Sequence, residues 1–199
     1  MDNDHLCLAI ADVSGKGVPA ALYGAFAGEL VRSRTFRRRF APHSFGPSTV
    51  LSSINTILHE RQLEEYYCTL CYAVFDLKRR TVVLANSGLP YPIRCSETEC
   101  APVEIAGVPL GAFAGSRYDE ITFDLHKGDL FVFCTDGVYD AMNTEGAEFG
   151  TAPVIEIVRD AHHLSSREIV DRIFAAVEAF RGDQPPNDDM TAVAVRITS

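Results

Sequence analysis

The sequence predicts an α+β sandwich in which helices pack against β-sheets. The apolar pattern gives the order strand, two helices, a run of strands, two helices and a final strand. This order differs from the regular strand–helix alternation of a doubly wound fold. The chain has 199 residues, 47% of them hydrophobic and 23% charged. We therefore expect residues 1–199 to form a single globular domain with a sizeable core.

The N-terminal part of the chain predicts one strand followed by two helices. Residues 6–11 form a short apolar run typical of a buried strand. A helix is expected over residues 18–34, because Pro19 suits a first helical turn and apolar side chains then recur at helical spacing. A second helix is expected over residues 47–65, again with one apolar face.

The remaining elements follow from a change of period in the middle of the chain. Strands are expected over residues 68–77, 81–86, 91–95, 121–125 and 129–134. The sequence GVPLGAFAG at 107–115 predicts a glycine-rich loop. Helices over 152–162 and 165–180 and a strand over 190–197 complete the order, and Ser165 with Glu168 forms a capping box.

Charge and cysteine content narrow the class of protein. The net charge of −9 argues against binding to a nucleic-acid backbone, and no apolar run approaches the ~20 residues of a membrane span. The N-terminal residues lack a signal-peptide pattern, so we expect a cytoplasmic protein with six free thiols. Cys68 and Cys71, with Cys95 and Cys100, have a spacing faintly like a zinc ribbon. Their strand context favours small core side chains instead.

Acidic residues stand where predicted strands meet turn-rich loops. Asp12 follows the first strand, Asp136 follows the strand ending at residue 134, and Asp188 and Asp189 precede the last strand. Carboxylates that meet at strand ends repel one another unless a cation lies between them. Oxygen ligands favour Mg²⁺ or Mn²⁺. The alternative, for each aspartate alone, is an ordinary turn residue. The GKG sequence at 15–17 does not match a nucleotide-binding P-loop.

Three segments around these aspartates resemble a known family. IADVSGKGVPAAL, GDLFVFCTDGVYDAMN and NDDMTAVAVRI are similar to signature segments of the PPM (protein phosphatase 2C-like) metal-dependent phosphatases. They look most like the branch of stage II sporulation protein E and the sigma-factor regulatory phosphatases. The resemblance extends from about Leu8 to Ile197. It implies an α/β/β/α sandwich of two antiparallel sheets flanked by helices.

The resemblance also implies a role for each matching residue. Asp12 would bridge two metal ions, Mg²⁺ or Mn²⁺, and the backbone carbonyl of Val13 would bind one of them. Asp136 and Asp188 would hold the other ion, with Asp189 beside them in the metal site. A water activated by the two ions would then hydrolyse the phosphate ester. The implied substrate is phosphoserine or phosphothreonine on a regulatory protein of the anti-anti-sigma-factor type, and a homodimer is compatible with this function.

The sequence also departs from the family pattern. Relatives carry a Gly-Gly-Asp-x-x-Asp run on a strand upstream of the position of Asp12, and MDNDHLC does not match it. We therefore expect a domain truncated at its N-terminus that lacks the first strand or strands. The alternative function is a catalytically impaired phosphatase-like module that docks a partner protein. Leu89 replaces a histidine common in relatives. An arginine cluster could dock an acidic partner or complement a helix dipole: Arg32, Arg34, Arg37, Arg38 and Arg39.

Overall fold

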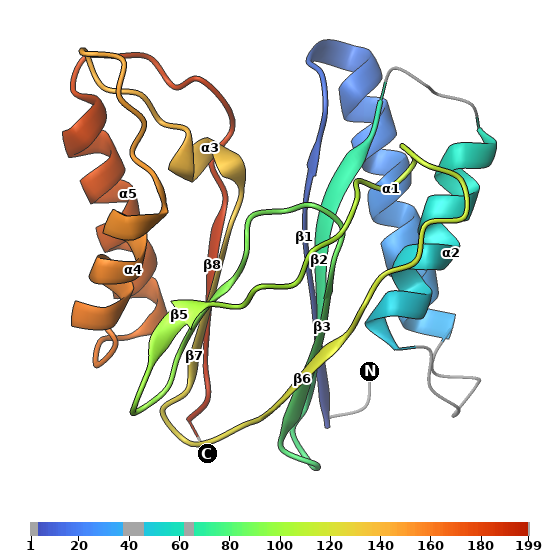
Figure 1. Ribbon diagram of the computed structural model, residues 1–199, viewed down its shortest axis with the longest axis horizontal. Helices are drawn as coiled ribbons and strands as arrows, with labels where there is room; N and C mark the ends of the chain where they lie inside the picture. The colour runs from blue at the N-terminus through green and yellow to red at the C-terminus, as the bar shows by residue number, and fades with distance from the viewer. Residues whose placement is uncertain (1–3, 38–45, 62–65, 199) are drawn as a thin grey trace. The chain divides into compact units, whose positions relative to one another are not determined.

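The computed structural model describes residues 4–37, 46–61 and 66–198, and these residues form two compact units (Figure 1). Unit 1 comprises Met1–Leu89 with Ile105–Leu125, and unit 2 comprises Pro90–Glu104 with His126–Ser199. Each unit contains one four-stranded antiparallel sheet with helices packed against it. The predicted combination of two antiparallel sheets with flanking helices is confirmed.

Unit 1 is built on a sheet of strand order β1-β2-β3-β6. Its elements are β1 (His5–Val13), α1 (Gly17–Arg37), α2 (Pro47–Glu60), β2 (Cys68–Asp76), β3 (Thr81–Asn86) and β6 (Ile121–Asp124). Helices α1 and α2 lie side by side on one face of the sheet (Figure 1). Their apolar side chains and those of β2 form a common core, in which Leu51 and Ile54 of α2 are fully buried.

Unit 2 has a sheet of strand order β5-β4-β7-β8. Its elements are β4 (Ile93–Cys95), β5 (Cys100–Pro102), β7 (Leu130–Cys134), α3 (Asp136–Tyr139), α4 (Thr151–Asp160), α5 (Ser166–Arg181) and β8 (Ala192–Arg196). Helices α4 and α5 pack on this sheet (Figure 1), and the core contains the fully buried Ile169, Ile173 and Val177 of α5. Ser165 and Glu168 form the predicted capping box at the start of α5.

The predicted elements agree with the structure to within a few residues, with two omissions. β5 and α3 were not expected, because three- and four-residue segments are too short to show a period. The expected helix over residues 47–65 is too long, because α2 ends at Glu60 and Arg61 is already its C-cap. Residues 62–65 lie outside the described part of the chain.

The glycine-rich loop at 107–115 is fastened to α2 and β2. The side chain of Asn55 is fully buried, and its amide donates to the carbonyl oxygen of Phe113 at 2.9 Å. The Asn55 carbonyl accepts the backbone N–H of Gly111, also at 2.9 Å. Leu110 exchanges two backbone hydrogen bonds with Cys68. These hydrogen bonds satisfy polar backbone groups of the loop and of Cys68, and they give the loop a defined path over unit 1.

The cysteines occupy two different environments. Cys68 and Cys71 are buried in β2, and burial raises the pKa of each thiol to about 12, so they behave as small core side chains as expected. The expectation of six free thiols is wrong for Cys95 and Cys100, which form a disulfide. The β4–β5 register places these two residues directly opposite each other. That proximity comes from strand pairing and cannot be inferred from spacing alone.

Within the described residues, no helix has both the length and the apolar character needed to cross a bilayer. The predicted arginine cluster is only partly described. The Arg32 guanidinium pairs with Glu29, with Nε and Oε2 2.8 Å apart, and Arg34 donates from Nε to Ser53 Oγ at 3.2 Å. The side chains of Arg37, Arg38 and Arg39 lie outside the described part of the chain.

Candidate metal centre

An acidic corner forms in unit 2 where β7 ends and β8 begins. Thr135, which is 2% exposed, links the two segments. Its backbone N–H donates to the carbonyl oxygen of Thr191 at 3.0 Å, and its Oγ1 accepts the N–H of Thr191 at 2.9 Å. Asp136 follows Thr135, and Asp188 and Asp189 lie shortly before Thr191. The hydrogen bonds therefore bring the predicted acidic residues of unit 2 into one corner.

Gly137 allows the two acidic segments to approach closely. A Cβ atom at this position would lie 2.3 Å from the carbonyl oxygen of Asp189 and 3.4 Å from the carbonyl carbon of Asp188. No side chain fits in that space, so only glycine permits the contact. Asp136 and the 188–189 segment consequently meet with backbone against backbone.

Local hydrogen bonds orient the two carboxylates. Asp136 Oδ1 accepts the backbone N–H of Gly137 at 2.9 Å, and Asp188 Oδ1 accepts that of Asp189 at 2.8 Å. Asp140 extends the group, because its N–H donates to the Asp136 carbonyl oxygen at 2.8 Å and its own carbonyl accepts from Asn187 Nδ2 at 3.2 Å. Among the described residues no hydrogen bond to the second oxygen, Oδ2, of Asp136 or Asp188 was found, so this oxygen can bind a cation.

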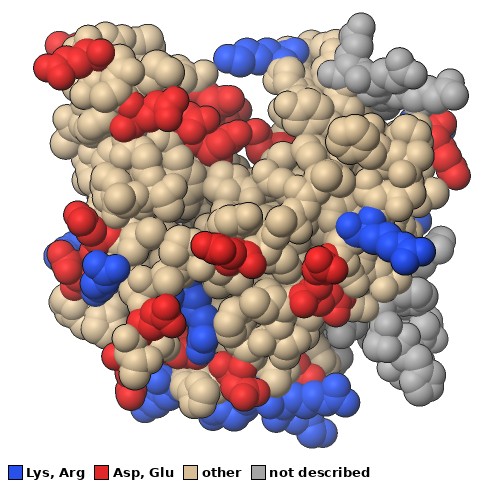
Figure 2. All heavy atoms as spheres, in the orientation of Figure 1, with Lys and Arg blue, Asp and Glu red and all other residues tan. Residues whose placement is uncertain are grey.

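The carboxylates of this corner repel one another. Partial burial raises the pKa of Asp140, and the nearby carboxylates of Asp136, Glu148 and Asp188 raise it further. Over residues 4–37, 46–61 and 66–198, no ion pair of Asp136, Asp140 or Asp188 with Lys or Arg was found. Figure 2 shows acidic side chains gathered over α3 and the neighbouring loops. Such a group gains stability from a divalent cation.

Asp140 is not among the aspartates that the sequence predicts as metal ligands. It lies at i+4 from Asp136 and caps the short helix α3. The spacing could have suggested a shared face, but only if α3 had been recognised as a helix. Because α3 has four residues, it leaves no periodic signal in the sequence.

Unit 1 carries the other two predicted ligands, Asp12 and Val13, at the end of β1. Asp12 lies opposite Thr69 of β2, and its carbonyl oxygen accepts from Thr69 Oγ1 at 3.4 Å. Val13 is the last residue of β1 and lies opposite Cys68. Burial, followed by the negative charge of Asp12, raises the pKa of the Cys68 thiol. That coupling indicates that the Asp12 charge acts on this end of the β1–β2 pair.

The turn after Val13 requires its glycines. Ser14 donates its N–H to the Tyr67 carbonyl at 3.0 Å and accepts the Tyr67 N–H at its Oγ at 2.9 Å. Gly15 and Gly17 then adopt φ values of 90° and 80°, which other residues rarely adopt. Helix α1 begins directly at Gly17. This sharp reversal lets a strand end, a carboxylate and a helix follow one another within six residues.

The structure thus groups the predicted residues in two sets. Asp136, Asp188 and Asp189 share a corner of unit 2, and Asp12 and Val13 share a strand end of unit 1. Across the described residues, no three acidic, His or Cys side chains already converge as a metal site. The donor chemistry nevertheless fits Mg²⁺ or Mn²⁺, because every candidate ligand is a carboxylate or carbonyl oxygen.

The chain is similar to known proteins of one family. The family model of stage II sporulation protein E (SpoIIE) matches residues 2–198. The phosphoserine phosphatase RsbU of Bacillus subtilis is 26% identical over 198 residues, which cover 98% of this chain and 56% of RsbU. Stage II sporulation protein E of Bacillus subtilis is 26% identical over 150 residues, covering 74% of this chain and 17% of that protein. The chain therefore spans about half of RsbU and less of the second relative.

Solved structures share the fold. The PP2C domain of SiaA from Pseudomonas aeruginosa superimposes with a TM-score of 0.83 at 22% identity, covering 99% of this chain and 78% of that one. RsbX in complex with magnesium gives 0.67 at 19% identity, with coverage of 98% and 82%. The catalytic domain of PstP in complex with two manganese ions gives 0.68 at 14% identity, with coverage of 100% and 94%.

Proposed function

Because this chain belongs to the stage II sporulation protein E family, we propose that it removes phosphate from phosphoserine or phosphothreonine with Mg²⁺ or Mn²⁺ as cofactor. The predicted resemblance to PPM-type phosphatases and the predicted protein phosphatase 2C-like fold are both confirmed. The proposed substrate is a phosphorylated regulatory protein of the anti-anti-sigma-factor type. Similarity to RsbU, a phosphoserine phosphatase, supports phosphoserine as the group that is hydrolysed.

The acidic corner of unit 2 is the observation that carries the proposal. Asp136 and Asp188 are brought together by the hydrogen bonds between Thr135 and Thr191 and by the close contact at Gly137. Asp140 and Glu148 add negative charge to the same corner. Phosphoryl transfer needs little covalent chemistry from the protein, so positioning of charge is the main contribution that such a site has to make.

Each candidate residue would have a separate task. Asp136 and Asp188 would hold one ion with Asp189 beside them, and Asp12 with the Val13 carbonyl would bind the other and link the two. Two divalent cations, when bound, activate water and neutralise charge on the phosphoryl oxygens. The N–H groups of Gly137 and Asp189 orient the carboxylates in advance, which lowers the cost of binding the ions.

The direct test is Mn²⁺-dependent release of phosphate from a phosphoserine peptide. We expect Asp136→Asn and Asp188→Asn to reduce turnover by more than about 100-fold while the fold is retained, as judged by circular dichroism. Asp183→Asn is the matched control, because Asp183 is an exposed loop residue with the same charge, and it should keep full turnover.

Calorimetric titration with Mn²⁺ separates the enzyme from the alternative of a docking module. Binding lost in Asp136→Asn together with phosphate release supports the enzyme. Binding without any phosphate release from the wild-type chain would support a catalytically impaired module. An absence of binding at millimolar Mn²⁺ would remove the basis for the proposed metal site. Asp12→Asn tests the shared centre, because it should weaken binding only if Asp12 contributes to the same ions.

A further inference from the structure

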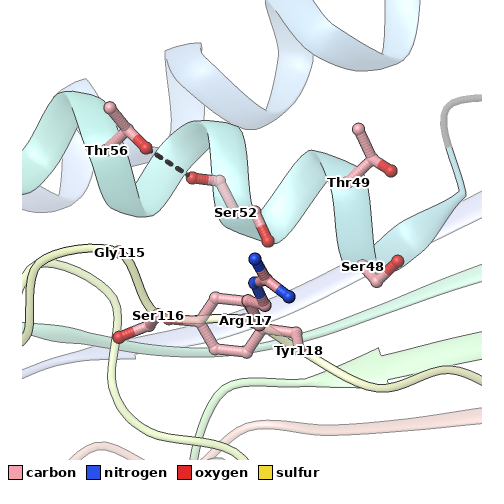
Figure 3. Close-up of a pocket in the computed structure, with 8 residues that line it drawn as sticks. All are labelled: Ser48, Thr49, Ser52, Thr56, Gly115, Ser116, Arg117 and Tyr118. Carbon is pink, nitrogen blue, oxygen red and sulfur yellow. Dashed lines mark hydrogen bonds between the residues drawn. The ribbon is translucent and has the colours of Figure 1, made fainter.

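A groove lies on unit 1, between α2 and the segment after the glycine-rich loop. It has a volume of about 470 Å³ and is lined on one side by Ser48, Thr49, Ser52 and Thr56 of α2. The other side is formed by residues 115–118, which include Arg117 (Figure 3). Most of the lining residues carry a hydroxyl group, and Arg117 is the one charged residue among them.

Arg117 supplies the charge of the groove. Its side chain is exposed, and Figure 3 shows its guanidinium directed toward α2, near Ser52. No hydrogen bond or ion pair of the guanidinium was found with any residue that the structure describes. Glu120 is already engaged, because Oε1 accepts both the backbone N–H and the hydroxyl of Ser48 at 2.8 Å. The guanidinium donors can therefore bind an external anion.

The hydroxyl groups of α2 complement this cation. The Thr56 hydroxyl donates to the Ser52 carbonyl oxygen at 3.0 Å, as the dashed line in Figure 3 shows. The hydroxyls of Thr49 and Ser52 make no hydrogen bond with any part of the chain that the structure describes. Thr49 and Ser52 lie three residues apart, on the same side of α2. Both hydroxyls can therefore donate to the same ligand.

The wall opposite α2 is held in place before any ligand binds. Asn55, buried within α2, bonds both Gly111 and Phe113, and Ser116 Oγ donates to the Phe113 carbonyl at 2.9 Å. These contacts fix the loop just before Arg117. A preformed wall reduces the entropy lost when a ligand binds.

The length of the groove indicates the kind of ligand. From Ser48 to Thr56 the α2 wall rises eight residues, or about 12 Å at 1.5 Å per residue. An extended polypeptide advances about 3.3 Å per residue, so the wall matches about four residues. A single phosphate or sulfate ion would contact only a small part of it. The groove is better suited to an extended chain that carries carboxylates.

We propose that this groove docks an acidic, extended polypeptide segment, with Arg117 and the Thr49 and Ser52 hydroxyls binding its carboxylates. The identification of that segment as part of the phosphoprotein substrate rests on the proposed function. Docking itself does not, since the groove residues belong to unit 1 and include none of the candidate metal ligands. The groove would select protein substrates by the acidic residues near or beyond the phosphorylated one.

Fluorescence anisotropy of a fluorescein-labelled hexaglutamate peptide tests the docking directly. The whole chain is used with EDTA at low ionic strength, so that no metal site contributes. We expect Arg117→Gln to weaken binding about 5- to 10-fold. Arg172→Gln, an exposed arginine of α5 in unit 2, makes the same change in net charge and should bind like the wild type. Equal affinity of Arg117→Gln and wild type, or no binding by the wild type, would overturn the proposal.

Two further measurements separate local recognition from net charge and from simple anion binding. The charge-neutral double variant Thr49→Val with Ser52→Ala should weaken hexaglutamate about 3-fold, and unchanged affinity would contradict the assigned donors. Inorganic phosphate at an equal concentration of charge should displace the peptide poorly. Full displacement by phosphate would show an anion site instead of a polypeptide site.

Turnover then connects the groove with the proposed function. If phosphate release is observed, Arg117→Gln should lower kcat/KM about 5- to 10-fold for a phosphoserine peptide with flanking glutamates. Hydrolysis of p-nitrophenyl phosphate, which has no polypeptide, should be unchanged. A wild-type chain that binds hexaglutamate but hydrolyses neither compound would refute the proposed function and leave the docking supported. Equal loss on both compounds would refute substrate docking.

Discussion

Replacing Gly137 by alanine should disrupt the acidic corner through a single methyl group. The added Cβ would lie 2.3 Å from the Asp189 carbonyl oxygen, about 1.1 Å inside the 3.4 Å at which ordinary contact begins. The clashing atom belongs to backbone that is tied to β7, because Thr135 Oγ1 donates to the same Asp189 oxygen at 3.4 Å. The carbonyl cannot rotate away as a flexible side chain would, so the 188–189 segment must move.

Two opposing effects determine the change in stability. Overpacking of this kind costs about 1–3 kcal/mol. Alanine is a better helix former than glycine by up to about 1 kcal/mol, and Gly137 lies within α3. The clash outweighs the gain in helix propensity, so we expect a net loss of about 1–2 kcal/mol in the free energy of unfolding. For a chain of this length that corresponds to a fall in Tm of about 2–8 °C.

The assay combines thermal unfolding with Mn²⁺ titration of the same samples. Because Asp188 must shift relative to Asp136, Gly137→Ala should weaken Mn²⁺ binding by about 10-fold or more. Gly28→Ala in α1 is the matched control, since a Cβ there has no atom within 4 Å. It should raise stability by about 0.5–1 kcal/mol and leave Mn²⁺ binding unchanged. An unchanged Tm and Mn²⁺ affinity in Gly137→Ala would refute the close contact at this corner.

Three other predictions test contacts that stabilise the two units. Ile173→Ala removes a fully buried side chain of α5 and should cost about 2–5 kcal/mol by chemical denaturation, whereas a cost below about 1 kcal/mol would contradict the described core. Asn55→Ala leaves the Gly111 N–H without its partner and removes one of the two donors to the Phe113 carbonyl; it should cost about 1–3 kcal/mol and speed hydrogen exchange at residues 107–118, and unchanged exchange would argue against the anchor. The Ser165 hydrogen bonds hold the pKa of Glu168 below its ordinary value of 4.5, so its stabilising contribution is present above that value and is lost as pH falls through the lowered pKa. Glu168→Gln should therefore be less stable than wild type at pH 7 and equal to it in strong acid, and a constant difference across pH would exclude this ionisation as the cause.

Local patterns explain why most of the fold could be predicted. The apolar periods located the strands and helices to within a few residues, and the Ser165–Glu168 capping box marked the start of α5 correctly. These signals depend only on residues that are close together in the chain, so they can be recognised from the sequence alone. Gly15 and Gly17 are also local signals, because the reversal from strand to helix requires positive φ values at these two positions.

The elements that were missed depend on pairing between distant segments. β5 exists because it pairs with β4, and α3 because Thr135 fixes the chain against the start of β8. The Cys95–Cys100 disulfide follows from the same β4–β5 register. Asn55 is a polar residue on an apolar helix face, and it anchors a loop more than fifty residues away in the sequence. None of these contacts leaves a periodic trace.

By itself, the sequence determined the chemistry available to this protein: aspartates at strand ends, glycines where the chain must reverse, and an acidic surface. The tertiary structure alone decided which of these groups are neighbours. Asp136 meets Asp188 and Asp189 because β7 pairs with β8 in a fixed register and Gly137 leaves room for the contact. Register is a non-local property, set by backbone hydrogen bonds and by which face of the sheet is buried, so a short motif does not contain it.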